Sequence, residues 1–168
     1  DRENEMITGT IQREDSYNLY VNLDKIEGVV PLKEQVVSEK YIPNERMKFL
    51  IKDVKSSSKE PQIVLSRSSE ILVTRLFELE VPEITEGVIE IYSIAREAGS
   101  RTKIAVFSND EAIDPVGACI GYKGARVNSI VEELQNEKID IINYDKSIEE
   151  FISNALSPAD IVEVLINE

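Results

Sequence analysis

The residues best suited to chemistry are Gly121-Tyr122-Lys123-Gly124, called the GxxG turn below, with Arg126 just behind. Two glycines let a backbone come close to a phosphate–sugar chain because no Cβ stands in the way. Lys123 offers a mobile positive charge, and Arg126 offers a planar set of donors. A helix that starts behind the turn would add its N–H groups and the positive end of its dipole. The pattern therefore predicts binding to a nucleic-acid backbone, with the bases in an apolar groove beside the helix.

The flanks of the GxxG turn predict two helices. Asp114-Pro115 is a sound helix start, an N-cap acid followed by proline, and the run from 115 to 120 is apolar. No acidic residue occurs from 115 to 131, which predicts a locally positive surface. A helix, a GxxG turn and a second helix form the device with which KH domains clamp nucleic-acid backbone. The plainer alternative is a tight turn between packed helices, with its charges merely solvated. After the turn, apolar residues recur at helical spacing, at Val127, Ile130, Val131 and Leu134.

The chain is acidic, with a net charge of −13, but the charge is unevenly distributed. Residues 1–68 carry 11 Lys and Arg against 12 Asp and Glu, whereas residues 69–168 carry 8 against 20. Any affinity for RNA must therefore come from a local surface. Histidine is absent, which excludes His-based general bases, Ser–His or Cys–His nucleophile pairs and His-containing zinc sites.

The compartment and the completeness of the chain are also indicated. Cys119 has no second cysteine to pair with, and its apolar neighbours predict a buried thiol in a reducing cytoplasm. The sequence shows no signal peptide and no transmembrane candidate, so we expect no membrane partner. Because the chain begins at Asp1 rather than Met, we expect a piece of a longer protein.

The first 67 residues alternate like strands. Leu19, Val21 and Leu23 share one face of a strand, and Met47, Phe49 and Ile51 share one face of another. A polar hairpin loop is expected at 56–61, between the last two strands. Five short strands predict a small closed barrel of the OB-fold type. They are expected at 6–11, 17–23, 26–32, 46–54 and 62–67.

The barrel offers a second candidate RNA surface. Tyr20 is expected to face outward as a stacking platform, beside a basic stripe of Arg46, Lys48 and Lys52 on an adjoining strand. Arg67, at the end of the last strand, is a weaker member of the same hypothesis. The alternative is that these are ordinary solvent-exposed residues, and Tyr17 is in phase with the buried set.

The hydrophobic period changes in the second half of the chain, which predicts a mixed α/β domain. The whole chain is thus expected to be α+β with two domains, 1–68 and 69–168. Ser147-Ile148-Glu149-Glu150 is a capping box that opens the last predicted helix. Helices are expected at 69–80, from Asp114, after the GxxG turn and from 147 to 156. Strands are expected at 88–95, 102–107, 139–142 and 161–166.

Other charged residues carry weaker hypotheses. Arg96, Arg101 and Lys103 surround the predicted hairpin turn at 99–100, where they either extend a basic path for RNA or balance acids such as Glu90 and Glu97. A metal-dependent hydrolase would need convergent carboxylates on rigid elements. The candidates are one N-cap and two loop residues, so no catalytic residue, metal or cofactor is expected. These acids are Asp110, Glu111 and Asp114.

The residues around the GxxG turn resemble one family. The stretches Asp114-Pro115-Val116-Gly117-Ala118-Cys119-Ile120-Gly121 and Gly124-Ala125-Arg126-Val127 are similar to the first KH domain of NusA, a family of bacterial transcription termination and antitermination factors. Residues 76–84, 95–106, 137–141 and 154–159 support the resemblance. The barrel half resembles the family's S1-motif domain, including the exit Leu65-Ser66-Arg67. At Tyr122 and Asn128 the chain departs from the usual family residues, but both glycines and Lys123 are kept.

The resemblance implies a non-catalytic fragment with an S1-type barrel and a bacterial-type (type II) KH domain. The family binds nascent single-stranded RNA, including ribosomal-RNA leader antitermination sequences. The full-length proteins act with RNA polymerase and other antitermination factors to modulate pausing, termination and antitermination in the cytoplasm. The family's N-terminal domain and second KH domain would lie outside this chain.

Two other interpretations stay open. The first is another RNA protein with the same parts, such as a polynucleotide phosphorylase tail or a ribosomal small-subunit KH protein. The order of barrel before KH domain argues against the former, and the barrel argues against the latter. The second is a protein–protein adaptor that docks on a basic partner through its acidic second half, with a vestigial GxxG turn.

Overall fold

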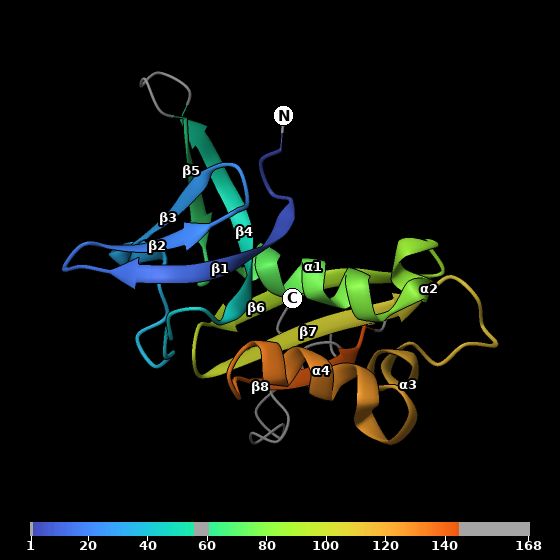
Figure 1. Ribbon diagram of the computed structural model, residues 1–168. Helices are drawn as coiled ribbons and strands as arrows, with labels where there is room; N and C mark the ends of the chain where they lie inside the picture. The colour runs from blue at the N-terminus through green and yellow to red at the C-terminus, as the bar shows by residue number, and fades with distance from the viewer. Residues whose placement is uncertain (1, 56–60, 145–168) are drawn as a thin grey trace, which may run out of the picture.

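The computed structural model of the chain describes residues 2–55 and 61–144 (Figure 1). Residues 56–60 of the predicted loop at 56–61, the helix at 147–156 and the strand at 161–166 lie outside the described residues, so they stay predictions. The proposed end of the second domain at 168 lies outside them as well.

The first half of the chain is a closed barrel in the strand order β1-β2-β3-β5-β4, which confirms the predicted five-stranded barrel. Neighbouring strands are antiparallel except for β3 and β5, which are parallel. The predicted alternation also holds, since Leu19 and Val21 on β2 and Phe49 and Ile51 on β4 are fully buried. The elements are β1 (Met6–Glu14), β2 (Asn18–Asn22), β3 (Glu27–Pro31), the 3-10 helix η1 (Leu32–Glu34), β4 (Arg46–Lys55) and β5 (Gln62–Ser66).

The expectation that Tyr17 shares the buried face of β2 is wrong. Its side chain is 74% exposed, and β2 starts one residue later. The cause is local, because Asp15 Oδ1 accepts hydrogen bonds from the N–H groups of both Tyr17 and Asn18 at 2.8 Å. This turn ends the strand alternation before it reaches Tyr17. The same hydrogen bonds lower the pKa of the Asp15 carboxyl.

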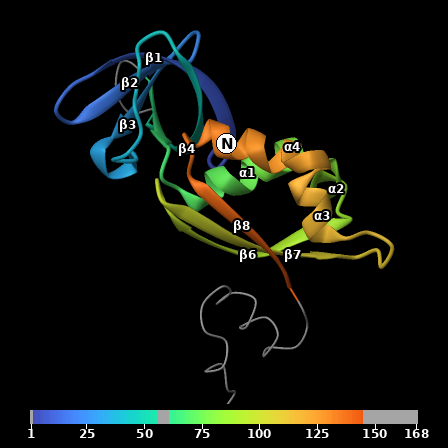
Figure 2. The same cartoon turned by 90° about the horizontal axis from the view of Figure 1, so that it is seen from below.

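The second half has the predicted order of helix, two strands, helix, GxxG turn, helix and strand, with one unpredicted short helix, α2, after the first. Its sheet has the order β6-β7-β8, in which β7 and β8 are parallel. The helices lie together on one face of this sheet (Figure 2). No helix in the described part of the chain has the length and apolar character needed to span a membrane. The elements are α1 (Glu70–Glu80), α2 (Pro82–Thr85), β6 (Ile89–Glu97), β7 (Arg101–Ser108), α3 (Pro115–Ile120), η2 (Tyr122–Gly124), α4 (Ala125–Glu133) and β8 (Lys138–Asn143).

One hydrophobic core fills the space between these helices and the sheet. Phe77 of α1, Ile104 of β7 and Ile130 of α4 are buried in it, together with Leu50 of the barrel strand β4. The two halves of the chain therefore share a core rather than being joined only by a linker. Cys119 lies in the same core, as predicted, and burial raises the pKa of its thiol to about 11.

A buried ion pair fixes the β6–β7 hairpin. Arg96 Nη2 lies 2.9 Å from Glu137 Oε1, and both side chains are almost completely buried. Glu137 also accepts hydrogen bonds from Thr102 Oγ1 and from the N–H of Gly99. Of the two hypotheses for Arg96, the balancing of an acid is the correct one, although Glu137 is the partner rather than Glu90 or Glu97.

Glu137→Gln tests this ion pair. The pKa of Glu137 is lowered in the folded state by its hydrogen bonds to Arg96, Thr102 and Gly99, against an opposing effect of burial. The contribution of the Glu137 charge to the free energy of unfolding is therefore fully present above the unfolded-state pKa, near 4.5. It is lost as the pH falls through the lower folded-state pKa. We expect the substitution to lower the free energy of unfolding by about 3 kcal/mol at pH 7, and by progressively less below pH 4.5.

Urea unfolding followed by circular dichroism at several pH values measures the effect. The exposed Glu97→Gln is the matched control, for which we expect a change within about 0.5 kcal/mol. A cost for Glu137→Gln that does not depend on pH would show that the charge of Glu137 is not what stabilises the hairpin.

Candidate nucleic-acid interface

The GxxG turn has an unusual backbone conformation. Gly121 has φ 80° and ψ 174°, and Gly124 has φ 79° and ψ 11°. Lys123 also lies in the left-handed region, with φ 53° and ψ 29°, which few residues other than glycine adopt. The turn is therefore a defined and somewhat strained structure, and strain of this kind often accompanies a binding role.

Gly121 is needed for space as well as for its φ angle. A Cβ at this position would lie 2.9 Å from both the backbone nitrogen and the Cβ of Arg126. The start of α4 can therefore pack against the end of α3 only because position 121 has no side chain.

Arg126 is engaged within the protein. Its Nη1 donates to the carbonyl of Ala118 at 2.8 Å, near the C-terminal end of α3, and to Glu83 Oε1 of α2 at 3.0 Å. These contacts hold the two helices on either side of the turn in place. A direct contact between Arg126 and RNA stays a prediction, but the structure gives this side chain a supporting role.

Tyr122 and Lys123 project from the turn. Tyr122 is 82% exposed, and Lys123 Nζ lies 5.5 Å from the centroid of its ring. Among the described residues, Lys123 forms no ion pair with an acidic side chain. Gly124 cannot cap α4 with a side chain, so the first N–H groups of that helix have no such partner. Positive charge and helix-end donors thus occur together at this point.

An aromatic groove of about 550 Å³ lies at the start of α3. Phe107, Ile113 and Pro115 line it, and the rings of Tyr92 and Tyr144 stack at 3.8 Å beside them. Asp110 and Glu111 also line this groove. Its chemistry suits a planar apolar group better than a phosphate.

The predicted barrel surface is divided in the structure. Tyr20 on β2 and Arg46 on β4 were expected on adjoining strands, but β1 lies between β2 and β4. The cation next to Tyr20 is Arg13, whose guanidinium lies 3.9 Å from the centre of the ring. Tyr20 also donates a hydrogen bond from its hydroxyl to Asp15. Arg46 is exposed and Lys48 is half-buried, so they stay candidates separate from Tyr20.

A groove with several lysines on the barrel escaped the sequence reasoning. Lys33, Lys52 and Lys55 line a hollow of about 560 Å³ together with the acids Glu34 and Asp53, so its lining carries both signs of charge. Of the three lysines, the sequence pattern singled out Lys52 alone. The parallel pairing of β3 with β5 helps bring these positions together, and strand alternation gives no sign of that pairing.

The structure also shows where Arg67 and the pair Arg101 and Lys103 lie. The hypothesis that Arg67 faces RNA is wrong, because its side chain is completely buried in contacts with Glu39 and Glu133. Arg101 is exposed and Lys103 half-buried on β7, where Arg101 lies opposite Lys138 of β8. Because Lys138 comes after α4 whereas the GxxG turn comes before it, Arg101 is separated from the turn by the length of that helix, about 13 Å for nine residues.

Two of the three acids considered for metal chemistry, Asp110 and Asp114, have local structural roles. Asp114 caps α3 by accepting from the N–H of Val116, and Asp110 accepts from the N–H of Ala112. Within residues 2–55 and 61–144, no group of three potential metal ligands comes together.

Comparison with known domain families divides the chain in two. Residues 1–67 match the S1 RNA binding domain, and residues 67–144 match the NusA-like first KH domain. The closed barrel and the helix–GxxG–helix arrangement on a three-stranded sheet agree with these matches. The molecule is thus of the class built from an S1-type barrel and a KH domain, both RNA-binding domain types.

Comparison with whole proteins gives the family. The chain is 49% identical to the transcription termination/antitermination protein NusA of Bacillus subtilis over 168 residues, and 46% identical to that of Thermus thermophilus over 162 residues. These alignments cover 100% and 96% of this chain but 45% and 42% of the relatives. The chain belongs to the NusA family, and it spans less than half the length of these relatives.

The packing of the GxxG turn can be tested with two glycines of similar φ. Gly121 and Gly87 have φ angles of 80° and 82°, but a Cβ at Gly87 would have no atom within 4 Å. Alanine at either position incurs a positive-φ backbone cost, which at Gly121 is about 1–3 kcal/mol because its ψ of 174° lies in a region that essentially only glycine adopts. We expect Gly121→Ala to lower the free energy of unfolding by about 1–3 kcal/mol more than Gly87→Ala, because it also forces α4 away from α3. Urea unfolding measures both, and equal costs would contradict the close approach.

Proposed function

We propose that this chain is a non-catalytic RNA-binding unit that holds the backbone of single-stranded RNA at the GxxG turn. The observation that supports this most strongly is the exposed Lys123, which has no acidic partner among the described residues and lies directly ahead of the start of α4, where no side chain caps the helix. A phosphate beside the turn would meet the lysine charge and the helix N–H groups together. Gly121 and Gly124 allow the positive-φ backbone on which this arrangement of lysine and helix start depends. The exposed ring of Tyr122 offers a face on which a base can stack.

The barrel supplies the second part of the proposed surface. Arg46 and Lys48 on β4 are the candidates closest to the KH domain, since the N–H of Lys48 bonds to Glu133 at the end of α4. Tyr20 is a stacking candidate on another part of the barrel. Arg101 and Lys103 lie at the end of the sheet near the end of α4, so they would extend a path between the turn and the barrel.

The biological setting follows from the names of the relatives. Because they are transcription termination/antitermination proteins, we propose that the RNA is a nascent transcript in a bacterial cytoplasm, ribosomal-RNA leader antitermination sequences included. Contacts with RNA polymerase and other antitermination factors would belong to the full-length protein. The share of binding that arises in this chain is then one part of a linked, multivalent interaction.

Lys123→Asp tests the proposed turn. We expect it to weaken binding of a labelled single-stranded RNA at least about tenfold, equivalent to about 1.4 kcal/mol, because a phosphate contact becomes a repulsion. We also expect the slope of log affinity against log salt concentration to lose about 0.7 in magnitude. Fluorescence anisotropy across a salt series measures both.

The matched control is Lys25→Asp, an equal change of charge at an exposed position in the β2–β3 turn. It should alter affinity by less than about twofold, a small effect on the free-energy scale. A duplex RNA of the same sequence checks that unstacked bases are required. If the wild-type chain binds no RNA at low salt, or if Lys123→Asp binds as well as the wild type, the GxxG assignment is wrong and the adaptor interpretation gains.

A further inference from the structure

Arg67 stands at the boundary between the two halves of the molecule. It follows β5 directly and precedes Ser69, the N-cap of α1. Its side chain has no exposed surface. A guanidinium has five N–H donors and cannot lose its charge inside a protein, so each donor needs an acceptor here. A desolvated charge at a domain boundary is therefore held by the elements that supply those acceptors.

All five donors of Arg67 find acceptors, and these come from both halves. From the barrel, Glu39 accepts from Nε at 2.9 Å and from Nη2, and the carbonyl of Lys48 accepts from Nη1 at 2.7 Å. From the end of α4, Glu133 accepts with Oε2 from Nη1 and with its backbone carbonyl from Nη2, both at 2.8 Å. No donor is left over for RNA.

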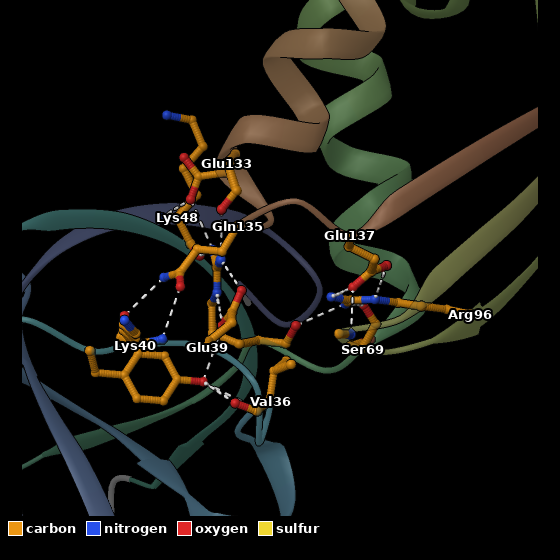
Figure 3. A network of polar contacts seen from close by, with 12 residues as sticks. Val36, Glu39, Lys40, Lys48, Ser69, Arg96, Glu133, Gln135 and Glu137 are labelled. Atoms are coloured by element: carbon orange, nitrogen blue, oxygen red, sulfur yellow. Dashed lines mark hydrogen bonds and ion pairs between the residues drawn. The ribbon is translucent and has the colours of Figure 1, made fainter.

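Three further hydrogen bonds strengthen the same junction (Figure 3). Glu133 Oε2 also accepts from the N–H of Lys48 at 3.0 Å. The Gln135 amide bonds to both backbone groups of Lys40, accepting from the N–H and donating to the carbonyl, each at 2.9 Å. We call Glu39, Arg67, Glu133 and Gln135 the interdomain junction. It ties the C-terminal end of α4 to β4 and to the loop that contains Lys40.

The N-terminal end of α4 directly follows the GxxG turn. Helix α4 has nine residues, so it is a rigid connection of about 13 Å between the interdomain junction and Gly124. The position of Lys123 relative to Arg46 and Lys48 on β4 is therefore set by how the end of α4 is fixed, together with the core that Leu50 of β4 shares with α4. Arg96 holds the chain from the opposite side by donating to the carbonyls of Arg67 and Ser69 at 2.8 and 2.7 Å.

We infer that Arg67 is a positioning residue for RNA: through Glu133 it fixes the GxxG turn at one orientation to the barrel, so that a single RNA strand engages both. This inference rests on the proposed RNA-binding function. Two sites joined rigidly act on one strand with a high effective concentration, and that gain is lost when the geometry is no longer held. The junction should thus matter for RNA that spans both domains and not for RNA that fits the turn alone.

The experiment compares two RNA lengths with the full 168-residue chain. An RNA of about four nucleotides fits the GxxG turn, and one of about 12 nucleotides reaches the barrel as well. Variants Arg67→Lys, Glu133→Gln and Gln135→Ala disturb the interdomain junction. Glu132→Gln is the matched control, because it removes the same charge from the neighbouring, exposed position of α4. Gln135 is exposed too, so its variant keeps the test valid should a buried substitution prevent folding.

We expect the junction variants to weaken binding of the long RNA at least about tenfold while they change binding of the short RNA by less than about twofold. Double electron–electron resonance measures the distance between spin labels on Lys25→Cys and Ser129→Cys. It reports the orientation of α4 relative to the barrel in the absence of RNA. Both positions are exposed, whereas Cys119 is buried. The distance distribution should be narrow in the wild type and in Glu132→Gln and should broaden in the junction variants.

Equal weakening of both RNAs with an unchanged distance distribution would overturn the inference, as would long-RNA binding that survives a broadened distribution. If the wild type binds neither RNA, the proposed function fails instead, and the spin-label distances still decide whether the junction fixes the orientation.

Discussion

The structure depends on one buried charge. The Arg67 guanidinium has no contact with solvent, and leaving a buried charge of this kind without partners costs several kcal/mol. The barrel supplies Glu39 and the carbonyl of Lys48, and α4 supplies Glu133, so neither half satisfies the charge alone. The apolar contact made by Leu50 lies at the same boundary, within the core of the second half. Two domains that are distinct in sequence are in this way folded as one unit.

The same principle explains how an acidic protein keeps a basic site. Arg67, Arg96 and Arg126 turn inward, where their planar donors match carboxylates and carbonyls. Each of them pairs with at least one acidic side chain. Arg67 pairs with Glu39 and Glu133, Arg96 with Glu137, and Arg126 with Glu83. Lysines are left at the surface, where a flexible ammonium on a long stem remains hydrated. Around the GxxG turn, this division of roles leaves Lys123 as an accessible cation next to a helix start.

Local patterns in the sequence were sufficient for much of the fold. Alternation along β2 and β4 predicted the barrel faces, and Asp114-Pro115 predicted the start of α3. Tyr17 failed because a short-range turn at Asp15 overrides the alternation. The burial of Arg67 and Arg96 could not be predicted for another reason. The partners of Arg67 lie 28 and 66 residues away, and that of Arg96 lies 41 residues away. In the sequence, a charged residue at the end of a strand looks the same whether it meets water or a distant carboxylate. The sequence was thus sufficient to predict the GxxG turn, but not the contacts of Arg67 that connect α4 to the barrel.

The strongly acidic surroundings need not oppose RNA binding at the turn. Negative surface repels a polyanion over about a Debye length, roughly 8–10 Å at physiological salt. Within the acidic second half of the chain, an approaching strand is then disfavoured least where the acid-free stretch from 115 to 131 reaches the surface. Like-charge repulsion of this kind suppresses wrong docking positions more than it weakens the correct one, because the correct one is stabilised by close contacts. In the proposed function, the acidic surface would thus limit where on the second half RNA binds, and affinity would come from the few groups that the turn presents.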